Sequence, residues 1–503
     1  MRPDAMGQFH FDVPQSVGEW FGQSLWGDAY ICGIEGVPWQ SHSKFDGSRL
    51  TVSRAIASSG KLYLACPMPG LGYRTLNTCS LQPLDTPHNL PLELARGSCY
   101  RARSQSDIWE RSGLTLSDRF KECLSAGSSL FLDAAQKRAD PEGSAELAVK
   151  AIEMLEQAII DLGESYAVQS ISYRKQHEPQ IGTLLASSVV PPSPASSTHA
   201  SQFCAAFNSA AIRINWSDIE TDSGRFDFDN VETTFQWCAS NGLRVLAGPL
   251  IDFRSKLMPH WLYLLEDDFN GFLNAVAQFV QRVVSRFRGS VQLWNCAAGL
   301  NTPGPLDLDD EQVMRLAVTI LQTVRRNDPK TPAIVSFDQP FGEYLAKHRD
   351  GISPMHFADA LARSGLGMVG LGLDIRLNYR TDATLPRSAV DFGHMIDRWS
   401  TLGMPLLVQL SSPGEHGPDP GAAAPQETLR TRFDSPDLGS DQLRVVAPLI
   451  RTLLAKHIVH GIVWDGWSDA VPHTQSHSGL IDSRGTPRPL LEYLVRLRRD
   501  FLV

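Results

Sequence analysis

The sequence lacks any apolar run of about 18 residues, the length needed to cross a membrane, and this excludes a membrane-spanning helix. Its eight cysteines include no CxxC pair, which argues against a zinc or redox motif and favours buried thiols in a reducing compartment. A basic excess is also absent: the net charge of −9 excludes the cationic surface that nucleic acids require. The opening residues, MRPDAMGQFHFDVPQ, contain no apolar stretch typical of a secretory signal, so we expect a cytoplasmic protein.

The composition is that of an ordinary globular protein. Hydrophobic residues make up 42% and charged residues 20% of the 503 residues, which is enough apolar material for a large core. The chain is too long for one average domain. Because an α/β barrel takes about 250 to 400 residues as a single domain, we expect a barrel and one smaller domain.

The N-terminal part carries the pattern of short strands. Within residues 1–110, apolar runs at 29–34, 61–66 and 90–95 are separated by turn signals, and this favours a β-sandwich. Such a β-rich domain could be a carbohydrate-binding module, although no motif in it is specific. Residues 111–177 read as a helical connector, with apolar residues at helical spacing in 115–138 and 142–167.

From residue 178 onward strand and helix patterns alternate, which is typical of a parallel sheet with crossover helices. Counting 181–187 as the first strand gives eight strands, and we assign residues 178–503 to a TIM (β/α)8 barrel. The remaining expected strands are 211–215, 244–250, 290–296, 333–337, 368–375, 405–410 and 461–464. The expected helices are 231–240, 270–287, 310–326, 357–364, 443–456 and 489–502.

A Pro/Ser-rich stretch at 188–202 has two interpretations. It could be a linker between domains, or the loop after the first barrel strand. We prefer the loop, because the barrel otherwise lacks a first strand.

Residues 211–265 contain a series of short motifs in a fixed order. A strand ending in Asn215-Trp216 is followed by DSGRFDF at 222–228 and by Asn-Gly at 241–242. A second strand ends in Gly248-Pro249, and PHW follows at 259–261. This order resembles the second and third βα units of family-10 glycoside hydrolases, the xylanases. Weaker matches extend the resemblance over about residues 178–503.

The resemblance implies a barrel that breaks glycosidic bonds with two glutamates, one as acid/base and one as nucleophile. The fourth-strand glutamate of the family falls on Gly299 in the run WNCAAG, or on Cys296 in a shifted register. The seventh-strand glutamate falls on Gln409 or Leu410 in the run PLLVQLSS. None of these residues is a carboxylate, so the resemblance indicates the fold while the usual catalytic pair is replaced.

Four aspartates fall at or just after expected strand ends: Asp252, Asp338, Asp374 and Asp465. Because reacting groups of such barrels lie at the carboxyl ends of the strands, these residues are candidates for a relocated catalytic pair. Alternatively, each caps a helix or is solvated in a loop, and we favour this second interpretation.

Other side chains at the same strand ends are candidates for sugar binding. Aromatic faces stack on sugar rings, and amides bond to hydroxyls. For each tryptophan, packing in the core is an equally good interpretation. The candidates are Asn215, Trp216, Trp261, Asn295, Gln409, Trp464 and Trp467.

Three further features have both a functional and a purely structural interpretation. His473 and His477 have a spacing that could indicate a metal site, but a solvated loop is the better interpretation. Cys296 could be a nucleophile, but no base is evident beside it and a buried thiol is favoured. The stretch 411–441 is either a lid over the barrel or disordered.

Three functions remain in competition. We prefer a family-10-like barrel that binds a polysaccharide or oligosaccharide without the family's chemistry. The alternatives are an active O-glycosyl hydrolase that uses the relocated aspartates, and a non-catalytic scaffold or interaction protein. We expect no cofactor, metal, nucleic acid or membrane partner, and the sequence leaves the oligomeric state open.

Overall fold

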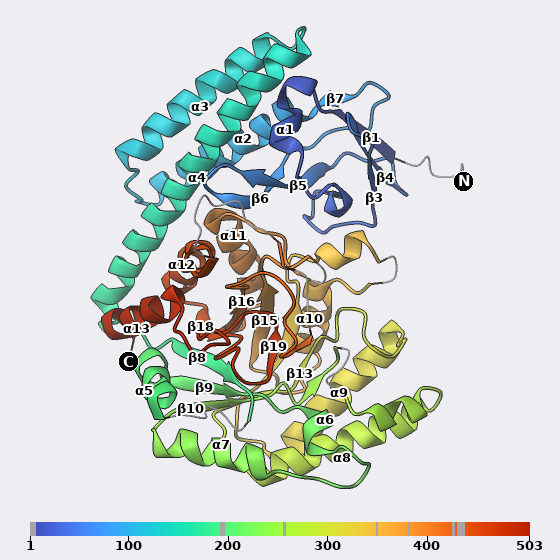
Figure 1. Cartoon of the computed structure of the whole chain (residues 1–503). Helices are drawn as coiled ribbons and strands as arrows, with labels where there is room; N and C mark the ends of the chain where they lie inside the picture. Colours follow the sequence, from blue (N-terminus) through green and yellow to red (C-terminus); the bar gives the residue numbers. More distant parts are fainter. Residues whose placement is uncertain are drawn as a thin grey trace.

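Eight parallel strands close into a barrel in the C-terminal part of the protein (Figure 1). The computed structural model describes residues 7–191, 197–254, 258–348, 351–380, 383–424, 428–429 and 438–502. Around the barrel the strands follow the order β10-β12-β14-β15-β16-β18-β8-β9. Their bounds are β8 (Leu184–Val189), β9 (Ser209–Ile212), β10 (Arg244–Ala247), β12 (Leu293–Asn295), β14 (Ala333–Asp338), β15 (Gly370–Arg376), β16 (Leu406–Ser411) and β18 (Val459–Trp464).

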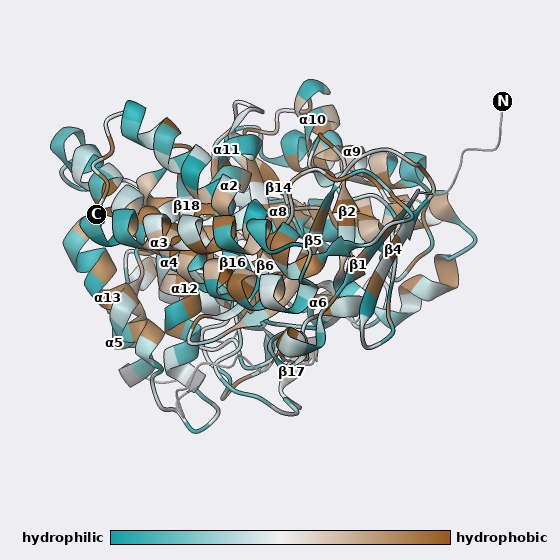
Figure 2. Ribbon diagram, turned by 90° about the horizontal axis from the view of Figure 1, so that it is seen from above, coloured by the Kyte–Doolittle hydropathy of each residue, from teal (hydrophilic) through white to brown (hydrophobic). Residues whose placement is uncertain are grey.

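Amphipathic helices surround the strands. In α8, for example, Phe272, Val276, Phe279 and Val283 recur at helical spacing and are buried, while the opposite face is polar. Bands of polar and apolar residues alternate along the helices in Figure 2. The helices are α5 (Ser197–Ala206), α7 (Asp229–Ser240), α8 (Phe269–Phe287), α9 (Asp310–Asn327), α10 (Pro354–Arg363), α11 (Ala389–Ser400), α12 (Leu438–Ala455) and α13 (Pro489–Phe501). Among the described residues, no helix has the length and apolarity to cross a membrane.

The barrel confirms the expected fold class. The strand positions agree with the sequence pattern to within a few residues, and the first strand begins at Leu184. The preferred interpretation of 188–202 as a loop is wrong at both ends, because residues 188–189 belong to β8 and residues 197–202 form the first part of helix α5. Residues 192–196 of that stretch lie outside the described residues. Helix α11 is an addition that the sequence pattern did not single out.

Two small sheets precede the barrel. One has the order β3-β4-β1-β7 and the other the order β2-β5-β6, and both contribute apolar side chains to one core. Their bounds are β1 (Gly7–Asp12), β2 (Tyr30–Cys32), β3 (His42–Phe45), β4 (Arg49–Arg54), β5 (Lys61–Met68), β6 (Gly72–Asn77) and β7 (His88–Asn89).

The expectation that 90–95 is a short apolar run of the β-rich part is wrong. These residues form the start of helix α2 (Leu90–Arg111). The side chain of Asn89 caps the helix by accepting a hydrogen bond from the Leu92 N–H, and Pro91 lies in its first turn. Leu90, Leu92 and Leu94 are buried beneath the sheets, so tertiary packing reinforces the local start signal.

Helix α4 connects the N-terminal part to the barrel. It extends from Pro141 to His177, about 55 Å at 1.5 Å per residue, and is longer than the pattern at 142–167 predicts. Its first turns are buried in the N-terminal core, and Ile171 is buried in the barrel core. Near its end Arg174 donates to the carbonyl of Leu454 in α12 at 2.9 Å. Figure 1 shows the helix running along one side of the molecule from the sheets to α12 and α13. Helix α3 (Asp118–Gln136) packs beside it.

The junction between the two parts contains a buried ion pair network, which allows a stability test. Arg101 of α2 pairs with Glu156 of α4 and with Asp391 of α11. Replacing Arg101 by Ala leaves the two carboxylates without a cationic partner, so we expect the free energy of unfolding to fall by about 3 to 5 kcal/mol. Arg111 on the same helix pairs with Asp107 in solvent, and Arg111→Ala should cost less than about 1 kcal/mol. Urea unfolding measures both, and equal losses would contradict the role assigned to Arg101.

Candidate functional site

Alternation along the barrel strands directs one set of side chains inward. Ala186, Ala211, Leu246 and Val463 fill the lower part of the barrel interior. Residues two positions further along the same strands therefore face inward at the carboxyl ends. There the lining changes from apolar to charged.

Arg213 lies at the end of β9 and joins two of the candidate aspartates. One Nη atom donates to Asp465 at 3.1 Å and the other to Asp252 at 3.0 Å. All three side chains are buried. Burial alone would raise the pKa of Asp252, but the adjacent guanidinium of Arg254 lowers it below the ordinary value.

Arg254 continues the network on the other side of Asp252. It pairs with Asp252 and donates to Asp374 at 2.8 Å, and its Nη1 lies 4.0 Å from Asp338. Arg376 donates to Asp338 at 2.7 Å. The four candidate aspartates are therefore buried and paired with arginines, and the favoured expectation that each caps a helix or is solvated in a loop is wrong. We call this cluster the mouth ion network: Arg213, Asp252, Arg254, Asp338, Asp374, Arg376 and Asp465.

Among the acids of this network, Asp374 has a pKa that is clearly raised above its ordinary value. Asp338 and Asp374 lie opposite each other on the paired strands β14 and β15. Burial and the neighbouring carboxylate of Asp338 raise the pKa of Asp374 to about 6, although Arg254 opposes the shift. Asp374 therefore carries a proton for part of the time near neutral pH.

Glycine occupies the first position that the family resemblance assigns to a glutamate. Gly299 follows β13 (Ala297–Ala298) and has a φ of 75°. A Cβ at this residue would lie 2.9 Å from Cγ of Arg254 and 3.3 Å from the backbone carbon of Phe253. The side chain of Arg254 thus fills the space beside Gly299.

The second such position is Gln409 in β16. It lies on the same side of the strand as Leu407, whose side chain packs against the interior cluster, so it faces inward and is half-buried. It is directly opposite Asp374 in the strand pairing. Asn295 at the end of β12 faces inward in the same way, and its Oδ1 has no hydrogen-bond partner among the described residues.

Three of the tryptophans expected at strand ends lie in the core. Trp216 stacks on Phe279 with 4.7 Å between ring centroids, and Trp467 makes an edge contact with Phe203 at 5.0 Å. Trp464 points away from the barrel interior, toward the surrounding helices. Each is at most 3% exposed, so none offers an open face to a sugar ring.

The other two candidates lie toward the rim. Trp261 is half-buried, and its Nε1 donates to the carbonyl of Glu220 at 3.1 Å. Asn215 is also half-buried, and its amide donates to the exposed Asp218 at 3.0 Å. Neither contacts the mouth ion network through a hydrogen bond recorded among the described residues.

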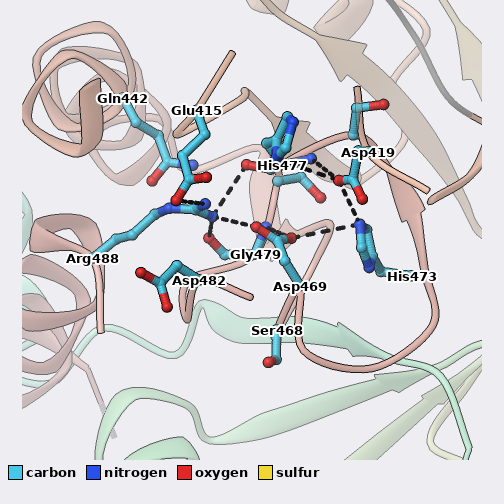
Figure 3. Close-up of polar contacts among 12 residues, drawn as sticks. Glu415, Asp419, Gln442, Ser468, Asp469, His473, His477, Gly479, Asp482 and Arg488 are labelled. Carbon is cyan, nitrogen blue, oxygen red and sulfur yellow. Dashed lines mark hydrogen bonds and ion pairs between the residues drawn. The ribbon is translucent and has the colours of Figure 1, made fainter. Parts of the chain in front are cut away.

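The expectation that His473 and His477 lie on a solvated loop after β18 is wrong. His473 is 4% exposed and its Nε2 lies 2.9 Å from Oδ2 of Asp419, which comes from the loop after β16. Figure 3 shows these side chains gathered around Asp469, with Arg488 on its opposite side. Arg488 donates to Asp469 at 2.6 Å.

Cys296 is a structural residue. It is fully buried, and burial raises the pKa of its thiol to about 12, so the nucleophilic thiolate is not available at neutral pH.

Backbone strain gathers around the same mouth. Among the described residues, three that are not glycine have positive φ: Gln339 at 45°, Asn378 at 60° and His477 at 53°. They follow β14, β15 and β18 respectively, on loops at the carboxyl ends. Such residues cost about 1 to 3 kcal/mol each and concentrate at functional sites.

Sequence reasoning missed the three arginines. A usable signal was present, since Asp252 and Arg254, like Asp374 and Arg376, are two residues apart and therefore share one side of an extended chain. Arg213 has no such local partner, because Asp465 is 252 residues away in the chain.

The protein is thus a (β/α)8 barrel with a polar, charged mouth and an N-terminal β-rich extension. Residues 172–299 match the family model of Glycosyl hydrolase family 10, and this confirms the family resemblance over that segment. A search of curated proteins by sequence finds no match.

Solved structures of xylanases are similar to the chain at low identity. Xylanase 10B of Thermotoga maritima is 15% identical, with 63% of this chain and 94% of that chain covered and a TM-score of 0.48. Xylanase B of Clostridium stercorarium F9 is 14% identical, with 64% and 98% covered and a TM-score of 0.47. An intracellular xylanase of Thermoanaerobacterium saccharolyticum, solved with xylotetraose, is 14% identical, with 63% and 96% covered and a TM-score of 0.47.

The crowding at Gly299 generates a prediction about side chains at this position. Gly299→Ala should cost roughly 2 to 3 kcal/mol, because the left-handed backbone and the contact with Arg254 both oppose a Cβ. Gly289 also has positive φ, but nothing lies within 4 Å of a Cβ there, so Gly289→Ala should cost only about 1 kcal/mol. Chemical denaturation compares the two variants, and a smaller loss at Gly299 would contradict the crowding.

Asp374 generates a second prediction, on the pH dependence of stability. Its pKa is about 6 in the folded protein and 3.8 ordinarily, so the folded state holds an extra proton between these values. This stabilising contribution is complete below about pH 4 and is lost as the pH rises through 6, by about 3 kcal/mol at most. Asp374→Asn stays neutral, so its stability relative to the wild type should increase from pH 4.5 to pH 8.

Unfolding in urea at both pH values measures this difference. The groups that act on Asp374 are Asp338, Arg254, Arg376 and Asp465, and all remain in the variant. The exposed Asp267→Asn serves as a control that should show no change with pH relative to the wild type. If the difference between Asp374→Asn and the wild type is the same at both pH values, the assignment of the titrating group is wrong.

Proposed function

We propose that the barrel binds a saccharide at the carboxyl ends of its strands, without the double-displacement chemistry of family-10 glycoside hydrolases. The match of residues 172–299 to that family supports a carbohydrate ligand. The charged mouth supports the position of the site, because ligands of such barrels bind at this end.

The observation that carries the proposal is a set of buried polar atoms that lack a hydrogen-bond partner among the described residues. Leaving such an atom without any partner costs about 1 to 3 kcal/mol, so a mouth rich in them suits a ligand with many hydroxyl groups. A sugar hydroxyl both donates and accepts, which matches carboxylate acceptors beside guanidinium donors. The atoms are Asn295 Oδ1, Asp338 Oδ1, Asp374 Oδ1, Asp465 Oδ2, Ser411 Oγ and the Nε atoms of Arg213 and Arg376.

The state of the carboxylates supports binding over turnover. Double displacement needs one carboxyl that transfers a proton and a second that attacks the anomeric carbon. The family's two positions hold Gly299 and Gln409. Each aspartate of the mouth ion network is paired with an arginine, which stabilises the charge and lowers its nucleophilicity.

Calorimetric titration with xylo-oligosaccharides of increasing length tests the proposal. We expect binding by the wild type and about tenfold weaker binding by Gln409→Ala, because an inward-facing amide is removed. Gln236→Ala alters the same residue type on the exposed face of α7 and should bind like the wild type. Failure of every xylo-oligosaccharide to bind would contradict the proposal and favour the scaffold function.

One observation favours an active hydrolase as the second candidate. The pKa of Asp374 is raised to about 6, which is the direction that a general acid requires, and Asp338 lies on the adjacent strand. Nη1 of Arg254 lies 2.8 Å from Oδ2 of Asp374 and 4.0 Å from Oδ2 of Asp338. The two carboxyl oxygens are therefore no farther apart than the sum of these distances, which is short enough for a glycosidase pair. Release of reducing sugar in the same incubations, abolished in Asp374→Asn but not in Asp267→Asn, would establish this candidate in place of binding alone.

A further inference from the structure

A second polar cluster lies beside the mouth, formed by Asp419, Asp469 and His473. Each offers one ligand atom, and these atoms all lie within 4.8 Å of one another. Asp419 comes from the loop after β16, whereas Asp469 and His473 come from the loop after β18 (Figure 3). The three side chains are between 1% and 7% exposed.

We propose that Asp419, Asp469 and His473 form a binding site for a divalent metal ion of the zinc class, which joins the loops after the seventh and eighth barrel strands. One imidazole nitrogen and two carboxylate oxygens are a ligand set that Zn²⁺ accepts. The site is separate from the mouth ion network and does not depend on saccharide binding.

The distances between ligand atoms suit such an ion. Nε2 of His473 lies 2.9 Å from the nearest oxygen of Asp419 and 3.7 Å from the nearest oxygen of Asp469. Bonds of about 2.0 to 2.2 Å at tetrahedral angles separate ligand atoms by about 3.3 to 3.6 Å. These two distances lie on either side of that range, and the two carboxylate oxygens lie within 4.8 Å of each other, so side-chain movements of about 1 Å bring the three atoms to the ion.

The surroundings hold each ligand in the orientation that a metal requires. Nδ1 of His473 lies 2.8 Å from the carbonyl of Val471, and this contact directs Nε2 toward the carboxylates. Asp469 accepts hydrogen bonds from the Gly479 N–H at 2.7 Å and from Arg488 at 2.6 Å. Metal ligands in proteins characteristically have such supporting contacts.

Asp419 is held in the same manner. Its Oδ2 accepts the backbone N–H of His477 at 2.7 Å, and its Oδ1 accepts that of Gly421 at 3.1 Å. Strand β17 (Ala422–Ala424) pairs with β19 (His473–Gln475) directly beside these contacts. The backbone therefore brings the two loops together at the point where the ligands meet.

The charge of the cluster also suits a divalent cation. Arg488 pairs with Asp469 and with Glu415 at 3.3 Å. With neutral His473 and a neutral His477, whose Nδ1 lies 3.5 Å from Oδ2 of Asp419, the carboxylates of Asp419, Asp469 and Glu415 and the one guanidinium carry a net charge of −2. A divalent ion neutralises this charge, whereas a proton on His473 compensates only half of it.

Three protein ligands leave a fourth coordination position for water. A small pocket at the mouth is lined by His473 together with Arg213, Asp465 and Trp467. The ion would thus lie next to the mouth ion network, and its loss would loosen the loops that border the saccharide site.

The test uses the full chain without a polyhistidine tag. The protein is stripped with a chelator, dialysed and titrated with Co²⁺ and with Zn²⁺ alone. We expect about one ion per chain, a visible Co²⁺ absorption spectrum and a higher melting temperature with Zn²⁺. In His473→Ala and Asp419→Ala the bound metal and the temperature shift should be lost.

His460→Ala is the matched control, since this exposed histidine lies on β18 outside the cluster and the variant should bind metal like the wild type. Circular dichroism verifies that each variant is folded. If His473→Ala does not fold, Asp419→Ala, which alters the loop after β16 and leaves the loop after β18 unchanged in sequence, gives the answer alone. The proposal is overturned if Asp419→Ala binds as much metal as the wild type and shows the same melting temperatures. A protonated His473 paired with two carboxylates would then explain the cluster.

Discussion

The ion pairing of three arginines with four aspartates is the constraint on which the rest of the barrel mouth depends. Transfer of an ion from water into the protein interior costs several kcal/mol, so each charge here requires its partners. Arg213 and Arg254 both bind Asp252, and they link it to Asp465 and Asp374, which lie in or directly after strands far away in the chain. The network thereby positions the loops that surround the mouth, and the side chain of Arg254 occupies the space beside Gly299.

The proposed binding function rests on a physical difference between this network and the catalytic pair of a retaining glycosidase. A glycosidase keeps its two carboxyls free to exchange a proton and to form a bond with the sugar. Here the carboxylates are engaged by arginines, and one oxygen atom each of Asp338, Asp374 and Asp465 is buried without a hydrogen-bond partner among the described residues. The proposed saccharide ligand would supply hydroxyl groups as partners for these atoms. The adjacent cluster of Asp419, Asp469 and His473 has a separate effect. It joins the loop after β16 to the loop after β18 beside the barrel mouth.

Much of the architecture could be predicted from the sequence, because apolar periodicity is a local property. The helix α8 and the strand β16 lie within a residue or two of their expected positions. The sequence pattern failed at Leu90–Ala95, where an apolar run belongs to a helix that two sheets cover. It also suggested sugar-facing roles for Trp216 and Trp464, since strand-end position alone does not show toward which side a side chain points.

By itself, the sequence determined the order of strands and helices, the closed barrel class and the lack of a carboxylate at Gly299 and Gln409. Only the tertiary structure decided what the four aspartates contact and that His473 meets Asp419. Secondary structure follows from residues that are neighbours in the chain. Ion pairing depends instead on which strand ends barrel closure brings together, as for Arg213 and Asp465, and no local pattern encodes that choice.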